Sequence, residues 1–176
     1  MAKYDTLFID GVQTPAATSN RINVVSAATE EVIGSAPEAS TSDVDTAVAA
    51  ARRAFNDPRG WTNWSPQERA KTIEKFAEEL ETRSAQITSL VAQQNGMPIS
   101  TAGILESALP TAVYRYYAGL LVETEQEETR PGLLGGRAVI RKMPMGVIAA
   151  IVPWNYPNLI TAAKLAPALA AVIRFG

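Results

Sequence analysis

The residue types that this chain lacks restrict its chemistry more than the types that it contains. Its 176 residues include no cysteine and no histidine. A thiolate nucleophile, a Ser-His-Asp triad and a zinc site built on nitrogen and sulfur ligands are therefore excluded within this chain, and we predict no metal site. Carboxylate, lysine, tyrosine, hydroxyl and amide groups remain. Any reaction that the sequence supports must use these groups or take others from elsewhere.

One short segment, Pro-Trp-Asn-Tyr-Pro at 153–157, places an amide and two aromatic rings between prolines. Taken alone, Asn155 is a good helix N-cap, because Asn is among the preferred residues there and Pro157 fits the first helical turn. Taken alone, Trp154 fits a protein core or interface, and Lys164 fits a solvated surface. From the residue types alone, these structural roles and a catalytic role both remain possible for the segment.

The elements that must position this segment follow from periodicity and from turn and capping signals. Short strands are predicted over 6–10, 21–25 and 32–36, and Asp10-Gly11 is a favoured hairpin turn. Ser40 and Ser65 each precede an acid three residues later, which indicates two capped helix starts. The first helix is predicted to bury one stripe, formed by Val44, Ala47, Val48, Ala51 and Phe55.

Two further helical stretches are predicted before residue 124. The second helix carries an apolar stripe from Ile73 to Val91, and Asn95-Gly96 ends it. The third extends over about 101–123 with a kink at Pro110. We interpret the glutamates over 123–128 as a solvated helix end, the glycines at 132–136 as a flexible turn, and 137–142 as a short strand.

The last section changes character. The run 146–152 is uninterruptedly apolar and of strand length, which is typical of strands buried on both faces of a parallel sheet. A helix rich in alanine and leucine is predicted over about 157–171. Strand, turn and helix together form the first half of a βαβ unit, so the fold class is α/β.

The charge balance argues against some classes of partner. Sixteen basic residues oppose 18 acidic ones, so a nucleic-acid or membrane-surface binder is not expected. No apolar run approaches the length of about 18 residues that a membrane span needs, and the first residues do not open a signal peptide. We therefore expect a cytoplasmic protein that binds neither nucleic acid nor membrane.

Several motifs, in order along nearly the whole chain, resemble those of the aldehyde dehydrogenase superfamily. They are Leu7–Gly11, Glu31–Gly34, Asp43–Ala51, Trp64–Arg69, Pro144–Val147, Pro153–Pro157 and Lys164–Ala170. The resemblance implies an amino-terminal β-hairpin and helices, followed by the first β-α unit of a truncated, Rossmann-like cofactor domain. The turn at 26–31 departs from the family by having Ala and Glu where Pro and Gly are preferred. A positive φ at Glu30 would strain it slightly.

The resemblance implies NAD(P)-dependent oxidation of an aldehyde to an acid, with NAD or NADP as the cofactor. Asn155 matches the family's amide donor to the oxyanion, and Lys164 matches a lysine near the active site that can relay a proton. Ile151, Val152, Pro153 and Trp154 match positions that line the cofactor cleft. The expected organisation is 1–124 for the amino-terminal strands and helices, 125–143 for an oligomerisation arm, and 144–176 for the first strand and helix of the incomplete dinucleotide-binding sheet.

The family's nucleophilic cysteine, general-base glutamate and remaining sheet are expected beyond residue 176, and the sequence diverges from the family at 172–176. We therefore expect an amino-terminal fragment that is inactive alone, from a truncated or frameshifted gene, and marginally stable because strand 146–152 lacks neighbours. The alternative is a non-catalytic assembly module that forms homo-oligomers or associates with a full-length relative. A carboxylate-based hydrolase is disfavoured because no polar cleft motif accompanies the glutamates.

Overall fold

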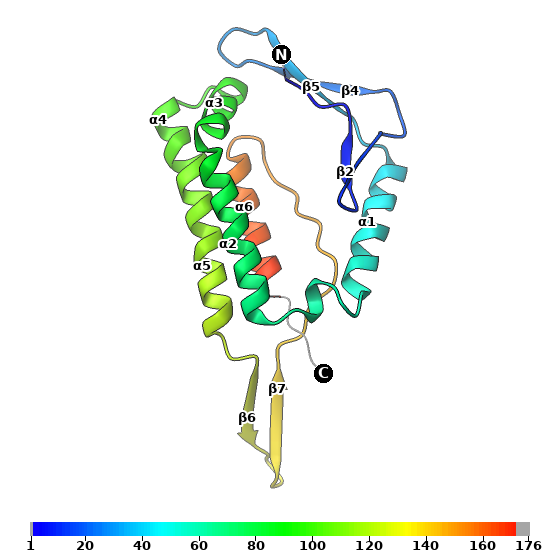
Figure 1. Cartoon of the computed structure of the whole chain (residues 1–176), viewed down its shortest axis with the longest axis vertical. Helices are drawn as coiled ribbons and strands as arrows, with labels where there is room; N and C mark the ends of the chain where they lie inside the picture. Colours follow the sequence, from blue (N-terminus) through cyan, green and yellow to red (C-terminus); the bar gives the residue numbers. More distant parts are fainter. Residues whose placement is uncertain (1, 172–176) are drawn as a thin grey trace.

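The computed structural model describes residues 2–171 of the chain. A helical bundle of α2 (Pro66–Thr82), α5 (Leu109–Glu123) and α6 (Pro157–Ala170) forms its centre (Figure 1). Small strands and α3 (Ser84–Asn95) lie at one end, and a long hairpin projects from the other. α1 (Thr41–Asn56) stands apart from the bundle, and the segment between the hairpin and α6 runs between them (Figure 1).

The amino-terminal strands form two small sheets. β2 (Leu7–Ile9) and β3 (Val12–Thr14) make an antiparallel hairpin, while the other sheet has the order β1-β5-β4, with β1 (Ala2–Lys3), β5 (Val32–Pro37) and β4 (Arg21–Val25). Asp10 and Gly11 have φ values of 56° and 78°, and a type I′ turn requires this sign at both central residues. The predicted strands and hairpin turn are confirmed. Glu30, in the turn at 26–31, also has a positive φ of 60°, the conformation that would strain this residue slightly.

The two predicted helix caps are present, each as a capping box, but most of the stripe predicted for the first helix is not buried. The Ser40 hydroxyl accepts from the Asp43 amide at the start of α1, and Ser65 pairs with Glu68 in the same way at α2. The prediction of a buried stripe on α1 is wrong, since its valines lie in solvent; Val44 is 53% exposed. Ala47 and Phe55 of the same stripe are half-buried, so the stripe is covered only in part.

The second predicted helix is two helices. α2 ends at Thr82, and α3 begins at Ser84 after a break at Arg83. The predicted stop at Asn95-Gly96 is confirmed, because Gly96 closes α3 in the left-handed conformation with φ 75°.

The third predicted helix contains a widened turn instead of a simple kink. α4 (Ile99–Ala102) continues into η2 (Gly103–Ala108), a π-helical turn, and then into α5, in which Pro110 is near the first position. A π-turn inserts one extra residue into the helix, and this insertion rotates the residues after it. It also coincides with the buried acid Glu106.

The core lies where α2, α5 and α6 meet. Ile73 and Ala77 of α2 pack with Tyr114, Ala118 and Leu121 of α5. α6 contributes three buried alanines with a spacing of four residues, Ala162, Ala166 and Ala170. Such small side chains on one helical face allow α6 to approach its neighbours closely. None of the helices described within residues 2–171 is long and apolar enough to cross a membrane.

The predicted strand at 146–152 is not formed. Residues 142–152 pass along the molecule as an extended segment that pairs with no strand in the described part of the chain. An isolated strand leaves its backbone groups to water, so the apolar sequence alone does not make a β-ladder. The predicted helix after it is confirmed as α6. The divergence expected at 172–176 lies outside the described residues.

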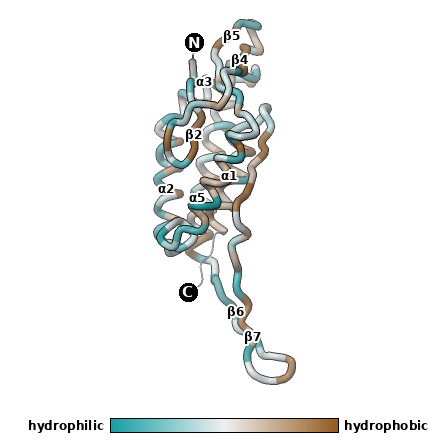
Figure 2. Tube along the Cα trace, turned by 90° about the vertical axis from the view of Figure 1, so that its right-hand side faces the viewer, coloured by the Kyte–Doolittle hydropathy of each residue, from teal (hydrophilic) through white to brown (hydrophobic). Residues whose placement is uncertain are grey.

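The predicted arm contains an antiparallel hairpin that projects from the bundle (Figures 1 and 2). β6 (Glu127–Pro131) pairs with β7 (Arg137–Arg141) over their full lengths. Because Glu127 and Glu128 lie in β6, only Glu123 ends a helix, and the interpretation of the whole acidic run as a helix end is corrected. Leu133 and Leu134 at the hairpin tip are fully exposed.

Candidate functional site

The Pro-Trp-Asn-Tyr-Pro segment forms the turn that leads into α6. α6 begins at Pro157 with Tyr156 as its N-cap, and no side chain of that residue caps it. Asn155 therefore does not act as the cap that its residue type allowed. Its exposed side chain makes no hydrogen bond to any of residues 2–171, whereas its backbone carbonyl accepts a hydrogen bond from Asn95 Nδ2 at 3.1 Å.

The first turn of α6 is capped instead by a distant carboxylate. Glu106 of η2 is fully buried, and its Oε2 accepts from the Asn158 backbone amide at 2.8 Å. Asn158 Nδ2 also donates to the Glu106 carbonyl at 3.3 Å. Burial raises the pKa of the Glu106 carboxyl, and the amides of Asn158 and Leu159 oppose that rise. A carboxylate at this helix end also suits the positive end of the helix dipole.

The opposite end of α6 is held by buried donors. Arg69 of α2 is almost fully buried, and its Nη1 donates to the Ala170 carbonyl at 3.2 Å. Trp61 Nε1 donates to the neighbouring Leu169 carbonyl at 3.1 Å. Burial lowers the pKa of the Arg69 guanidinium. α6 is therefore fixed at both ends by groups whose charge complements its dipole.

The residues predicted to form the site are all exposed. Ile151 is 87% exposed and Trp154 is 74% exposed, while Val152, Pro153 and Asn155 are also exposed in the same continuous segment. Lys164 lies further along α6, exposed, and forms no ion pair with the residues that the structure describes. The structure thus brings five predicted residues together by sequence adjacency, and it shows no contact between Lys164 and Asn155.

Comparison with known proteins decides the family. The model of the "Aldehyde dehydrogenase family" matches residues 14–172. This chain belongs to the aldehyde dehydrogenase family. Geranial dehydrogenase of Castellaniella defragrans is 41% identical over 165 residues, which are 94% of this chain and 34% of that protein. The aldehyde dehydrogenase of Alternaria alternata is 37% identical over 93% of this chain and 32% of its own length.

Solved structures give the same result. A Mycobacterium tuberculosis aldehyde dehydrogenase complexed with NAD+ matches with a TM-score of 0.91 and 37% identity, over 98% of this chain and 35% of that one. An NAD-dependent aldehyde dehydrogenase from Sinorhizobium meliloti matches with a TM-score of 0.89 and 31% identity, over 97% and 34%. The α/β fold class is confirmed as the amino-terminal part of this architecture. The chain spans about a third of the length of these relatives.

Local sequence patterns do not reveal the residues that hold the Pro-Trp-Asn-Tyr-Pro turn and α6. Asn95 belongs to the predicted helix stop and Arg69 to the motif Trp64–Arg69, and neither pattern indicates a long-range hydrogen bond. Glu106 received no role, although an acid between Leu105 and Ser107 in an apolar helix is a signal of a buried polar partner. The partners of these residues lie 60, 101 and 52 positions away, and no local pattern identifies such a partner.

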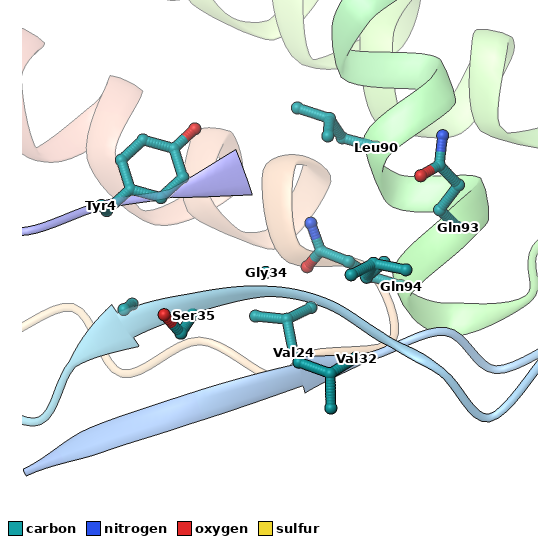
Figure 3. A pocket seen from close by; sticks show the side chains of 10 residues that line it. Tyr4, Val24, Val32, Gly34, Ser35, Leu90, Gln93 and Gln94 are labelled. Atoms are coloured by element: carbon teal, nitrogen blue, oxygen red, sulfur yellow. The ribbon is translucent and has the colours of Figure 1, made fainter. Parts of the chain in front are cut away.

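A separate cavity of about 340 Å³ lies between the β4–β5 sheet and α3 (Figure 3). Val24, Val32 and Leu90 line it together with Gln93 and Gln94, and Tyr4 lies at its edge. None of the six predicted site residues contributes to it. It holds no cluster of groups that could perform the family's chemistry.

Proposed function

We propose that this chain provides the oxyanion-binding amide of an NAD(P)-dependent aldehyde dehydrogenase, and that Asn155 is the donor. The observation that carries the proposal is the side chain of Asn155, which makes no hydrogen bond to any of residues 2–171, at a turn whose carbonyl accepts a hydrogen bond from Asn95. A neutral N–H donor fixed where negative charge develops stabilises the transition state more than the ground state. Because Glu106 accepts the hydrogen bond at the first turn of α6, the side chain of Asn155 is not needed as the helix cap.

The same segment is proposed to form one wall of the cofactor cleft. Ile151, Val152, Pro153 and Trp154 offer an exposed apolar surface directly before α6. A relative with the same fold is complexed with NAD+, which supports a nicotinamide dinucleotide as the ligand. Lys164 is proposed to relay a proton near this cleft, and an aldehyde is the proposed substrate of the complete site.

The chain alone is proposed to be inactive, because it contains no cysteine to form the covalent intermediate of the family's reaction. The purified 176-residue chain is titrated with NAD+ and with NADP+, and an aldehyde is then added. We expect no reduced nicotinamide to form. Turnover by material free of any longer enzyme contradicts this part of the proposal, whereas cofactor binding without turnover supports a half-formed cleft.

The role of Asn155 is tested in a chimaera. Residues 14–171 of this chain replace the corresponding third of the Castellaniella geranial dehydrogenase, and Asn155→Asp then exchanges the donor for an acceptor of the same size. We expect kcat to fall about 10²- to 10³-fold, with little change in KM. The matched control is Asn56→Asp at the exposed end of α1. Equal activity of the Asn155 variant and the control rules out the donor role.

A second function, as an assembly module, is favoured by the projecting β6–β7 hairpin. Its tip carries Leu133 and Leu134 with no cover from residues 2–171. We propose that this arm joins copies of the chain, or joins it to a full-length relative. Light scattering of the purified chain measures the first, and co-purification with the active geranial dehydrogenase measures the second. The double variant Leu133→Asp with Leu134→Asp should abolish either association. If the unmodified chain is monomeric and does not co-purify with the relative, both forms of the assembly proposal are contradicted.

A further inference from the structure

The segment before α6 has few polar contacts with the rest of the described chain. Over residues 143–155, the bond from Asn95 Nδ2 to the Asn155 carbonyl is the only hydrogen bond to any other described residue. The segment forms no strand and no helix over the same range. The backbone position of Asn155 therefore depends on a side chain 60 residues earlier.

Asn95 is itself held in place. Its Oδ1 accepts from the Met97 amide at 2.9 Å, so the orientation of the side-chain amide is set by its own turn. Gly96 closes α3 directly after it with φ 75°. Asn95 is half-buried, and it offers Nδ2 to the Pro-Trp-Asn-Tyr-Pro turn from a fixed helix end.

The downstream side of the turn is fixed independently. Glu106 binds the Asn158 amide at 2.8 Å, so the first turn of α6 cannot shift along its axis without breaking this bond. Asn155 is therefore held at its own carbonyl by Asn95, and the chain is held again three residues later by Glu106. With its backbone held at these two points, its side chain retains only its two χ torsions.

We propose that Asn95 is a positioning residue for Asn155. An oxyanion donor acts only when its N–H lies within hydrogen-bond distance of the place where charge develops, and small displacements lower the rate strongly. Asn95 supplies this precision by holding the Asn155 carbonyl, and it does not itself touch a substrate. The inference rests on the proposed role of Asn155 and adds the residue that makes the role possible.

Asn95→Asp in the 176-residue chain is the first variant, because it removes the Nδ2 donor and keeps the acceptor for Met97. Nitrogen-15 relaxation is measured without aldehyde or cofactor. We expect the order parameter of the Asn155 backbone amide to fall from near 0.85 to below about 0.6, and its side-chain amide to lose order as well. Ala162 and Ala166 in the buried face of α6 should keep their wild-type values.

Asn63→Asp is the matched control. Asn63 Nδ2 donates to the Asp57 carbonyl at 2.8 Å, so this variant removes the same kind of bond from a different turn. It should leave Asn155 at its wild-type order. Asn95→Ser is a second variant, because its hydroxyl keeps an acceptor near Met97 and introduces no charge; it should reproduce the effect of Asn95→Asp.

Wild-type order at Asn155 in both Asn95 variants overturns the proposal. A loss of order that spreads through α6 to Ala162 and Ala166 also overturns it, because Asn95 then acts on the fold as a whole. A loss confined to the turn supports it. These outcomes are separate from the chimaera assay of Asn155, since that assay can fail while the turn still responds to Asn95.

Discussion

The α2–α5–α6 bundle and the layer formed by α1 with residues 143–156 both have apolar side chains, but they differ in burial. The apolar side chains of the bundle are mostly buried or half-buried, whereas many of those in the layer are exposed. Ile73 of α2 is 2% exposed, because α5 and α6 cover it. Val44 and Val48 of α1 lie in solvent, as do Ile148 and Ile151 of the segment before α6. Periodicity therefore indicates which face of an element is apolar, but it does not indicate whether the chain contains the cover for that face.

The contrast extends to polar groups. In the bundle, two buried charged side chains, Glu106 and Arg69, bind backbone groups at the two ends of one helix. In the outer layer, residues 143–155 have one hydrogen bond to the rest of the described chain. The candidate site thus combines a helix that is bound at both ends with a preceding segment that has one hydrogen bond to the rest of the described chain.

The largest effect on stability is expected from Ile73→Ala. This change leaves a cavity in the bundle and should lower the free energy of unfolding by about 2–5 kcal/mol. Urea denaturation followed by circular dichroism measures it. Ile148→Ala in the outer layer serves as the comparison and should cost far less, because Ile148 is already mostly in solvent. Similar losses in the two variants would mean that the outer layer is packed in solution.

Glu106→Gln should change the pH dependence of stability. Burial raises the pKa of Glu106 above its ordinary value of 4.5, so the folded state binds the proton more tightly than the unfolded state does. The stability gained from this protonation is fully present below pH 4.5 and is lost as the pH rises through the folded pKa. We expect wild type and variant to be similar in acid, with the variant the more stable near neutral pH. Denaturation over a pH series tests this, and a wild-type advantage that grows with pH would refute it.

The two capping boxes should differ in the reach of their effects. Ser65→Ala removes the cap of a core helix and should lower the global free energy of unfolding by about 1 kcal/mol. Ser40→Ala removes an equivalent cap from α1, which packs little against the bundle, so the loss should appear as faster amide exchange within α1. Equal protection changes throughout the chain in both variants would erase the distinction between the two regions.

The smallest effect is expected from Val44→Ser on the exposed face of α1. Surface substitutions away from special features usually change stability by less than about 0.5 kcal/mol. The same denaturation assay measures it. A loss as large as that of Ile73→Ala would show that α1 buries this face in solution, for example against a second copy of the chain.

Local signals in the sequence predicted most elements of the fold. Asp10-Gly11, the two Ser-to-acid capping boxes and Gly96 act within a few residues, so their effects follow from sequence alone. The break at Arg83 and the π-turn around Glu106 were not predicted, because neither has a strong local breaker. The strand expected at 146–152 failed for another reason, since a strand depends on a neighbour that its own sequence does not contain.

The candidate site divides in the same way. Asn155 and the residues before it are predicted from a short motif, and their role stays a prediction. Their supports, Asn95 and Glu106, are separated from them in sequence by more than fifty residues. Hydrogen bonds of this kind are set by the packing of α3, η2 and α6. These hydrogen bonds can be identified only from a structure in which those helices are packed together.

The cap that Glu106 supplies has a consequence for dinucleotide binding. In many nucleotide-binding folds the pyrophosphate sits on the free amides of the helix that follows the first strand. Here the Asn158 amide already donates to the Glu106 carboxyl group, which is part of the protein and buried from solvent. The first turn of α6 therefore offers one amide fewer to an outside anion, and the exposed apolar side chains of Ile151 and Trp154 before the helix supply no charge in its place.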